Sequence, residues 1–503
     1  MAVYGIDFGT CNSCIAVAED DGTLAVVPSS RNETTTPSVV MFNLKKNGKP
    51  VVGTTAKNGF SKPNPRNVVA FAKTELDNEL TKEEYQITDT EIRKLSPIEP
   101  VACILYELIS HSNHFRGTQG LPISNNAVIT VPAVCSDIQR EKTKIAAELA
   151  GINVLKVISE PTAAAISYNI QDGETVMVFD LGGGTLDVSI VQCSNNRDYR
   201  VLATEGDPDL GGKRWDEVLL QLCYENASLT FSDSLATAKR LIEFEKFKID
   251  LCEAGNVDVT FVDEDGIQQL QEISIEEFEQ SSQHLIERAL KVVDLAINSV
   301  PNIRINRVCL AGGSSKVPAI KQNLQQHLPG IVVEVCDPDM AIAKGAAKYA
   351  YSLIGDSNKE DISIDERGHA YGIVTTDNNG CQIVENIIMK NDTLEISGRT
   401  FVRYMPNTSK RLSITVVENS IDRKRFEYRG QKAFFSGDVL FPQSVEIGQQ
   451  IDFILSRDSD GIVHLNVACS GKNSNFEFAT KVNEVSEIVR SNVLALIDKM
   501  KNN

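Results

Sequence analysis

The sequence predicts a mixed α/β protein, in which a large N-terminal domain of two lobes precedes a small β-sandwich domain. Its 503 residues are too many for a single ordinary core. Strand and helix patterns alternate up to about residue 355, whereas short runs of alternating polar and apolar residues dominate from about residue 369. An approximate internal repeat in the first half is the third observation, and it indicates that the large domain is duplicated.

Composition and charge are those of a soluble globular protein. Hydrophobic residues make up 42% of the chain, charged residues make up 23%, and the formal net charge is −18. An acidic chain argues against broad binding to nucleic acid or to anionic membranes, so we expect neither partner. We find no secretory signal and no apolar run near the ~18 residues that span a bilayer. The eleven cysteines are mostly scattered singly, as in a reducing compartment, and we expect a cytoplasmic protein.

The predicted elements follow in order along the chain. Residues 128–134 form a predicted strand that ends at a proline, and residues 136–151 a predicted helix that stops at a glycine. Residues 239–255 have amphipathic helical spacing. From these patterns and the polar, turn-rich segments between them we assign four parts: the large domain at 1–355, a linker at 356–368, a β-sandwich at 369–482 and a short C-terminal helix at 483–503.

Each copy of the repeat is a strand that ends in an aspartate, a glycine-rich turn with a threonine, and a second strand. The first copy, GIDFGTCNSCIAV, spans residues 5–17, and the second, MVFDLGGGTLDVSIV, spans residues 177–191. Consecutive backbone N–H groups in such a turn bind an anion, and glycine lets the anion approach the backbone. The carboxylate that ends such a strand, Asp7 in the first copy and Asp180 in the second, can hold a hydrated Mg²⁺ ion. Two ordinary hairpins are the alternative, which the repetition makes the weaker interpretation.

The first copy also contains a C-x-x-C pair, Cys11 and Cys14, which is a pattern of redox and metal sites. A zinc site needs further ligands, and the sequence has neither a second C-x-x-C nor a paired histidine group. Side chains three residues apart on a regular strand point to opposite faces, which disfavours a bridge between them. We therefore favour the anion-binding interpretation and keep a redox pair as the alternative.

Two further segments place charged or small residues beside helix starts. In ISEPTAAAISY, Glu160 precedes a proline that suits the first turn of a helix, and three alanines form a face that another backbone can approach. In VCLAGGSSKVPAI, Gly312 and Gly313 follow a buried strand and leave room for a flat base. The alternatives are a carboxylate that stabilises a helix dipole and simple packing of a helix on a strand.

The two copies of the repeat and these two segments, in their order along the chain, resemble the nucleotide-binding domain of the DnaK-type heat-shock chaperones, the seventy-kilodalton class. More distantly they resemble the actin and sugar-kinase ATPases. The resemblance implies a two-lobed actin/hexokinase-like ATPase domain that hydrolyses ATP to ADP and phosphate with Mg²⁺. It covers about residues 5–355 and includes TPSVV (36–40), NAVITVPA (126–133), EPTAAA (160–165) and GDPDLGGKRWD (206–216).

The resemblance also implies roles for individual residues. Asp7, Asp180 and Asp187 would surround Mg²⁺, largely through waters, and would orient the attacking water. Such a set suits phosphoryl transfer, because positioning and charge neutralisation do most of that chemistry. The predicted catalytic residues are Lys73, Glu160, Asp180, Thr185 and Asp187. The predicted nucleotide-binding residues are Gly9, Thr10, Cys11, Asn12, Gly182, Gly183, Gly184, Thr185, Glu245, Lys248, Gly312, Gly313, Ser314, Lys316 and Asp339.

The chain departs from the family pattern at several places. Lys316 stands where many of these chaperones carry an arginine against the adenine, and Ile249 occupies the opposing position. The segment between Asp216 and Glu245 is shorter than usual, so the resemblance does not extend to the docking of an exchange factor. The C-terminal third matches only in pieces, DISIDERG replaces a leucine-rich linker, and we expect a shortened or lidless member from which peptides exchange quickly.

The leading functional hypothesis is an ATP-dependent molecular chaperone that controls the binding of unfolded, hydrophobic peptide segments, with a J-domain co-chaperone as a partner. A nucleotide-binding co-chaperone or regulator with little hydrolysis is the alternative, which the degenerate linker favours. A small-molecule kinase of the same superfamily would leave the β-rich C-terminal part without a role. A narrower hypothesis concerns Cys11, since its oxidation beside the phosphate site would block ATP.

Overall fold

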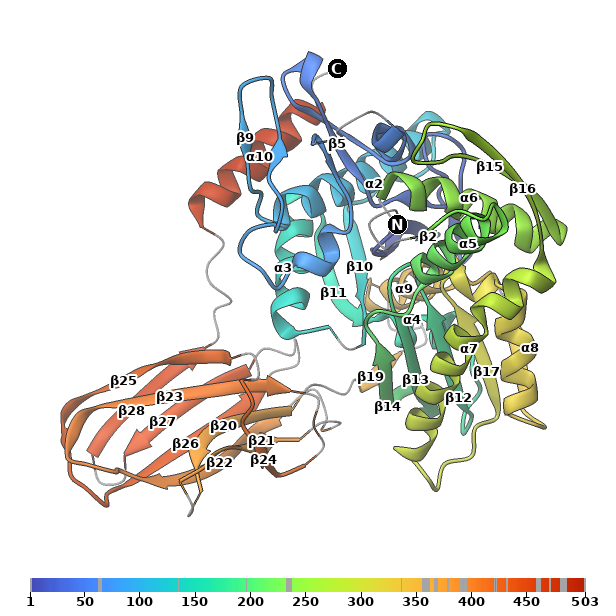
Figure 1. Cartoon of the computed structure of the whole chain (residues 1–503). Coiled ribbons are helices and arrows are strands. Elements are labelled where there is room, and N and C mark those ends of the chain that lie inside the picture. Colours follow the sequence, from blue (N-terminus) through green and yellow to red (C-terminus); the bar gives the residue numbers. More distant parts are fainter. Residues whose placement is uncertain are drawn as a thin grey trace. The chain divides into compact units, whose positions relative to one another are not determined.

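The computed structural model divides the chain into two compact units (Figure 1), and each is described by itself. The first unit comprises residues 1–134, 142–364 and 487–503, and the second comprises residues 365–486 together with the short segment 135–141. The structure describes residues 2–61, 66–133, 135–195, 197–231, 238–335, 337–354, 362–365, 370–377, 380–389, 392, 396–419, 421, 423–430, 433–457, 463–469, 472–479 and 486–501.

The first unit contains two large sheets that repeat one arrangement. In each sheet an antiparallel hairpin lies at the centre, and one strand of this hairpin pairs in parallel with a strand from later in the chain. The first sheet has the order β11-β10-β1-β2-β3, with β4 beside β2, and the second has the order β18-β17-β12-β13-β14-β19. The two central hairpins are the two copies of the sequence repeat. The predicted two-lobed, actin-like α/β fold is therefore confirmed.

The strands of these sheets are short and mostly buried. In the first sheet they are β1 (Val3–Asp7), β2 (Asn12–Ala18), β3 (Leu24–Val26), β4 (Thr36–Pro37), β10 (Asn126–Val131) and β11 (Asn153–Ser159). In the second they are β12 (Thr175–Leu181), β13 (Leu186–Ser194), β14 (Asp198–Asp207), β17 (Arg307–Ala311), β18 (Val332–Val335) and β19 (Ser363–Asp365). Smaller sheets pair β5 (Val40–Asn43) with β6 (Lys49–Val52) and β7 (Val68–Val69), β8 (Tyr85–Gln86) with β9 (Ile92–Arg93), and β15 (Asn256–Val262) with β16 (Gln268–Ser274).

Two small-residue helices, α4 (Glu160–Ser167) and α9 (Ala341–Ile354), pack against each other and share one core with residues of both sheets. The three alanines of EPTAAA are fully buried in that core, as the sequence predicted. α4 begins with a proline in its first turn, where the missing N–H leaves no intrahelical bond unmade. The contact places Glu160, the first residue of α4, at a fixed point between the lobes.

The remaining helices of the first unit surround the sheets. α7 begins with a capping box, in which the Ser274 hydroxyl accepts a hydrogen bond from the Glu277 N–H and the Glu277 carboxylate accepts one from the Ser274 N–H. The predicted helices at 136–151 and 239–255 are confirmed as α3 and α6. The bounds are α1 (Thr54–Lys57), α2 (Ile98–Thr118), α3 (Asp137–Leu149), α5 (Gly212–Asn226), α6 (Ala238–Ala254), α7 (Ile275–Asn298) and α8 (Pro318–His327), with short 3-10 turns at η1 (Leu44–Lys46), η2 (Asn58–Ser61), η3 (Ala72–Glu75) and η5 (Gly313–Lys316).

The second unit consists of two antiparallel sheets with a shared apolar core. Buried and less buried residues alternate along β26 and β27, which is the pattern of strands with one face toward a core. One sheet has the order β24-β21-β20-β23-β25 and the other β22-β26-β27-β28. The strands are β20 (Ala370–Thr376), β21 (Gln382–Ile388), β22 (Ile396–Tyr404), β23 (Ser409–Asn419), β24 (Arg425–Glu427), β25 (Ala433–Val445), β26 (Gln450–Arg457), β27 (Val463–Cys469) and β28 (Lys472–Ala479).

Two segments that follow the large domain in the sequence lie against it in the structure. Ser363–Asp365, within the expected linker, is a strand (β19) beside β14, and the neighbouring Ile362 is buried. The rest of the expected linker lies outside the described residues. The C-terminal helix α10 (Glu487–Lys501) packs against α2 and β6 and buries Val493, Leu496 and Ile497. Apolar spacing made this helix predictable, but its partner surface was not.

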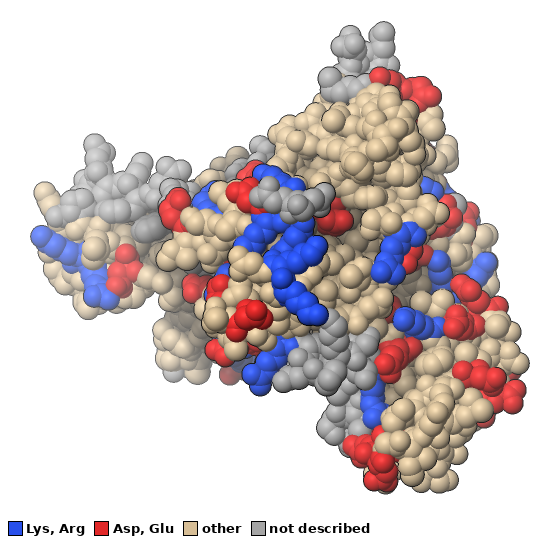
Figure 2. Space-filling model, turned by 90° about the horizontal axis from the view of Figure 1, so that it is seen from above, with Lys and Arg blue, Asp and Glu red and all other residues tan. Residues whose placement is uncertain are grey.

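The surface carries charges of both signs. On the face shown in Figure 2, lysine and arginine side chains lie beside aspartate and glutamate side chains, although the chain as a whole has a net charge of −18. Among the described residues, no helix has both the length and the apolar character that crossing a bilayer requires.

Candidate functional site

A cavity of the first unit with a volume of about 330 Å³ lies between its two central hairpins. The carboxyl ends of β1 and β12 meet there, so that Asp7, the last residue of β1, and Asp180, the residue before the last of β12, line the cavity together. Glycine-rich turns from both hairpins form the wall beside them, and the Gly312–Gly313 turn after β17 adds a third. The lining therefore combines backbone amides with a cluster of carboxylates.

The two turns are held in place by hydrogen bonds and by direct contact. In the second hairpin the Gly182 N–H donates to the Thr185 carbonyl over 3.0 Å. In the first, the Ser38 hydroxyl donates to the Gly9 carbonyl over 2.7 Å. A Cβ atom on Gly183 would lie 2.2 Å from the Cys11 Sγ atom and 2.8 Å from the Cys11 Cβ atom, so a larger residue fits there only if Cys11 shifts. Glycine thus lets the second turn pack closely on the Cys11 side chain of the first.

One buried ion pair lies among the carboxylates of the cavity. The Lys73 Nζ atom is 2.7 Å from the Glu160 Oε1 atom, and about a tenth of either side chain is exposed. The two residues are 87 positions apart in the sequence, and α4 and η3 bring them together. Lys73 also lies over the Phe8 ring, 5.6 Å from its centroid. A lysine this buried is held by its partner, and it provides a fixed positive charge inside the cavity.

The aspartates around this pair are driven toward their neutral forms. Burial, followed by repulsion from Glu160, raises the pKa of Asp7 to about 7 and that of Asp187 to about 7. The same two causes, with Asp187 and Asp7 in addition, raise the pKa of Asp180 well above its usual value. A single lysine therefore leaves several carboxylates without a compensating charge. Such a cluster of acids between two glycine-rich turns attracts a cation.

The residues present fit a hydrated Mg²⁺ ion. The buried Oδ1 atom of Asp187 has no hydrogen-bond donor among the described residues, so it has an unused acceptor site. The described residues hold no group of three His, Cys, Asp or Glu side chains that converge closely enough to bind a metal directly. A donor set of separated carboxylates suits Mg²⁺, which keeps several of its waters and accepts hydrogen-bonded carboxylates around them.

Charged pairs also organise the far end of the cavity. Lys248 and Asp216 form a buried ion pair of 2.7 Å, and the Lys248 ammonium donates to the Gly212 carbonyl over 3.0 Å. Burial opposes the charged form of Lys248, but Asp216 outweighs it and raises the pKa of this lysine. Lys57 of one lobe pairs with Glu245 of the other, and Lys316 pairs with Asp339. The Asp339 carboxylate lies beside Gly313, where an added Cβ atom would be 2.6 Å from its Oδ1 atom.

Comparison with known proteins places this site in a family. A family model described as Hsp70 protein matches residues 3–503. The chain belongs to the Hsp70 family. Members of this family bind nucleotide and are ATPases.

Curated relatives match along nearly the whole chain. A chaperone protein DnaK from Stenotrophomonas maltophilia is 27% identical over 533 residues, covering 98% of this chain and 80% of the relative. A chaperone protein DnaK from Mycoplasma mobile is 30% identical over 516 residues, covering 100% of this chain and 81% of the relative. A chaperone protein dnaK from Gracilaria tenuistipitata var. liui is 30% identical over 542 residues, covering 100% of this chain and 83% of the relative. Their similarity extends beyond the Hsp70 nucleotide domain into the β unit.

The structure brings most of the predicted residues to the cavity of this Hsp70-family chain. Gly184 and Asp187 are the two that do not line it: the Gly184 backbone packs against Gly211, and Asp187 is buried next to the backbone of Gly206. The predicted residues that line it are Asp7, Gly9, Thr10, Cys11, Asn12, Lys73, Glu160, Asp180, Gly182, Gly183, Thr185, Glu245, Lys248, Gly312, Gly313, Ser314, Lys316 and Asp339. Their roles remain proposals.

Other residues at the cavity were missed by sequence reasoning. Cys252 and Glu253 line it from α6. Lys57 was also missed, and it forms an ion pair with Glu245, which lines the cavity. Cys252 could have been found from helical spacing, because it is four residues after Lys248 and lies on the same face of the helix. No local signal marks Lys57, whose partner is 188 positions away.

The C-x-x-C pair does not form a disulfide in the structure. Cys11 and Cys14 are both free, and Cys14 is buried in β2 opposite Asp7. Burial, followed by the charge of Glu245, raises the pKa of the Cys11 thiol to about 12. Burial also raises the pKa of Cys14. Both groups are therefore held as thiols, which are poor nucleophiles, and this disfavours the redox interpretation.

Proposed function

We propose that this Hsp70-family chain is an ATP-dependent molecular chaperone. It hydrolyses ATP to ADP and phosphate, and the nucleotide controls the binding of unfolded, hydrophobic peptide segments to the β-sandwich unit. The observation that carries the proposal is the Lys73–Glu160 ion pair of 2.7 Å, buried among three aspartates between two glycine-rich turns. The DnaK relatives are named as chaperones, which supports the peptide-binding part.

In this proposal each group of residues has a distinct task. Backbone amides of the turns at 9–12 and 182–185 bind the phosphates, and Lys73 places a positive charge beside the transferred group. Glu160 holds Lys73 and, with Asp180, orients the attacking water. Asp7, Asp180 and Asp187 would hold Mg²⁺, which would supply charge neutralisation at the phosphate oxygens. Gly312 and Gly313 lie against the base, between Lys316 and Ile249.

A regulator that binds nucleotide with little hydrolysis is the second candidate. Ile249 is exposed and Lys316 is paired with Asp339, so neither provides the planar arginine that DnaK-type chaperones stack on adenine. Under either function we propose a cytoplasmic protein, with a J-domain co-chaperone as a partner of the chaperone. An exchange factor is not part of the proposal.

A peptide-binding experiment separates the two candidates. The affinity of the full-length protein for a fluorescent, unfolded hydrophobic peptide is expected to differ by about fivefold or more between its ATP-bound and ADP-bound states, since coupling free energies are typically ~1–3 kcal/mol. A peptide of the same length with its apolar residues replaced by serine is the control. Equal affinities in the two states, with ATP turnover undetectable, would favour the regulator.

The raised pKa values predict how Mg²⁺ stabilises the protein at different pH. Asp7 and Asp187, with pKa values near 7, ionise in the folded protein well above the ~3.9 of an unfolded chain. Their burial therefore destabilises the fold increasingly as pH rises from about 4 through about 7. Mg²⁺ relieves this penalty only at a pH at which Asp7 and Asp187 are ionised.

We expect Mg²⁺, added to the ADP-bound protein, to raise the thermal unfolding midpoint more at about pH 8 than at about pH 6. Asp187→Asn should reduce the difference, and equal increments would contradict the prediction.

A further inference from the structure

The loop between β14 and α5 lies directly behind the second glycine-rich turn. The first two N–H groups of α5 donate to that turn, from Gly212 to the Gly182 carbonyl and from Lys213 to the Gly183 carbonyl, each over 2.9 Å. A Cβ atom on Gly211 would lie 2.4 Å from the Gly184 backbone. Backbone atoms of residues 211–213 therefore fix the shape of the turn, although these residues do not line the cavity.

Asp207, the last residue of β14, organises this loop. Its Oδ1 atom accepts a hydrogen bond from the Asp209 N–H over 3.0 Å, which starts the turn, and Leu210 is completely buried at its end. The preceding residue, Gly206, pairs with Asp187 across β13 and β14, and a Cβ atom on it would lie 2.9 Å from Asp187 Oδ1. A shift of Asp207 would thus move both the Asp187 side chain and the loop behind the glycine-rich turn.

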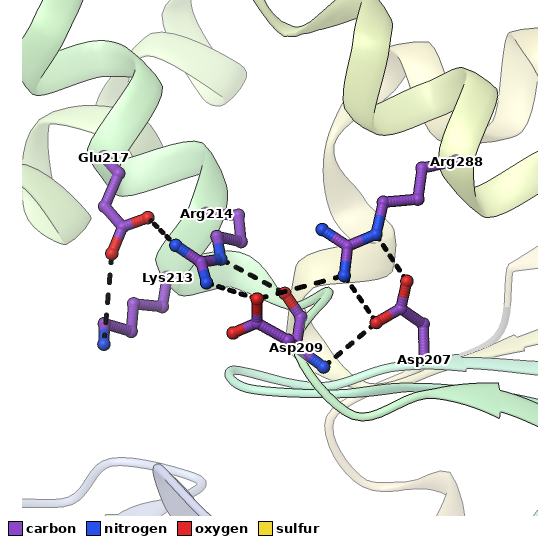
Figure 3. A network of polar contacts seen from close by, with 6 residues as sticks. All are labelled: Asp207, Asp209, Lys213, Arg214, Glu217 and Arg288. Carbon is purple, nitrogen blue, oxygen red and sulfur yellow. Dashed lines mark hydrogen bonds and ion pairs between the residues drawn. The ribbon is translucent and has the colours of Figure 1, made fainter.

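Arg288 of α7 holds Asp207 in place. Its Nε and Nη2 atoms donate to the two carboxylate oxygens over 2.5 and 2.7 Å, a bidentate pair that Figure 3 shows face to face. The Asp207 side chain is 15% exposed and that of Arg288 is 39% exposed. A second group, in which Arg214 bridges Asp209 and Glu217, joins this pair through Asp209, whose Oδ2 atom is 3.9 Å from Arg288 Nη2 (Figure 3).

We propose that Arg288 is a positioning residue for the phosphate groups of the nucleotide. It touches no part of the cavity, and it acts through Asp207 on the loop behind the second glycine-rich turn. Phosphate binding by backbone amides depends on their exact directions, so a loosened loop weakens contacts with phosphate and leaves contacts with the base unchanged. The inference rests on the proposed function, because it assumes that the cavity binds ATP.

The test compares the binding of ATP with the binding of adenosine, which lacks phosphates. We expect Arg288→Gln to lower the affinity of the full-length protein for ATP by about tenfold and to change the affinity for adenosine by less than about twofold. Arg288→Lys, which keeps the charge and loses the fork, should fall between Arg288→Gln and the wild type. Isothermal titration calorimetry gives both affinities without any need for hydrolysis.

Arg307→Gln is the matched control. Arg307 also forms a bidentate pair, with Glu174 over 2.7 and 3.2 Å, and it is less exposed than Arg288. Arg307 lies in the sheet that contains Asp207, at the end away from the cavity, because Arg307 aligns with Val176 whereas Ala311 aligns with Asp180 at the cavity. Its loss should lower the thermal unfolding midpoint at least as much as Arg288→Gln does and leave the ratio of ATP to adenosine affinity unchanged.

The possible outcomes are distinct. If the wild type binds ATP and the ratio of ATP to adenosine affinity is unchanged in both Arg288 variants, the positioning role is overturned and the proposed function is not. An equal change of the ratio in Arg307→Gln also overturns it, because the effect would then be general loss of stability. A wild type that binds no ATP contradicts the proposed function and the inference together.

Discussion

ATP turnover is expected to fall by at least about a hundredfold when Lys73 is replaced by alanine or Asp180 by asparagine, because each change removes charge from the transition-state site. Lys73 is the cation of the buried pair with Glu160, and Asp180 lines the same cavity. Lys246→Ala is the control, since Lys246 is an exposed lysine on α6, the helix that places Lys248 at the cavity. Steady-state phosphate release measures all three variants.

The two variants are expected to differ in stability, which separates lost chemistry from lost folding. Lys73→Ala leaves the Glu160 carboxylate buried without its partner and should cost about 3–5 kcal/mol. Asp180→Asn removes a carboxyl group whose pKa is raised by burial and by Glu160, so its thermal unfolding midpoint without Mg²⁺ should equal or exceed that of the wild type. Turnover in Asp180→Asn that matches Lys246→Ala would remove the enzyme interpretation.

Gly345→Ala is expected to destabilise the first unit by at least about 3 kcal/mol, the upper end of the range for overpacked cores. A Cβ atom on Gly345 would lie 1.7 Å from the Ala163 carbonyl oxygen, so α9 and α4 would have to move apart. Backbone cannot move aside as a flexible side chain does, and this contact is part of the core shared by both lobes. Chemical denaturation of the wild type and of Gly345→Ala, followed by circular dichroism, measures the change in the free energy of unfolding.

Gly117→Ala is the matched control, with the opposite expected sign. Gly117 is also in a helix, α2, but the nearest atom to an added Cβ is 4.0 Å away. Alanine should therefore stabilise the helix by about 0.5–1 kcal/mol, because it restricts the unfolded chain. Two substitutions of one kind, in two helices of one unit, should thus change the free energy of unfolding in opposite directions. A loss at Gly345 below about 1 kcal/mol would contradict the close packing of α4 and α9.

Most of the site could be predicted from the sequence because its signals are local. A strand that ends in aspartate before a glycine-rich turn predicts a hairpin from a few residues, and its repetition at Asp7 and Asp180 indicated two lobes. The three alanines after Glu160 predicted close packing in the same way. Resemblance to the DnaK-type chaperones added residues without a local signal, above all Lys73, which by itself reads as a surface lysine.

Long-range partners could not be predicted. Nothing near Lys57 indicates a pair with Glu245, and nothing near Asp207 indicates one with Arg288, because these partners meet only when separate helices pack on a sheet. The segment at 362–365 reads as part of a polar linker, yet Ser363–Asp365 completes the edge of a sheet. The packing of α10 on α2 and β6 was unpredictable for the same reason.

The sequence by itself determined the fold class, the family resemblance and the chemical identity of the residues at the cavity, because turn glycines, helix starts and apolar periodicity act over a few residues. Only the tertiary structure decided which charges are paired, which carboxylates are buried, and which turns touch. These properties depend on distances between segments far apart in the chain. The raised pKa values of Asp7, Asp180 and Asp187 arise in this way, since burial and the charge of Glu160 exist only after both lobes have folded around the cavity.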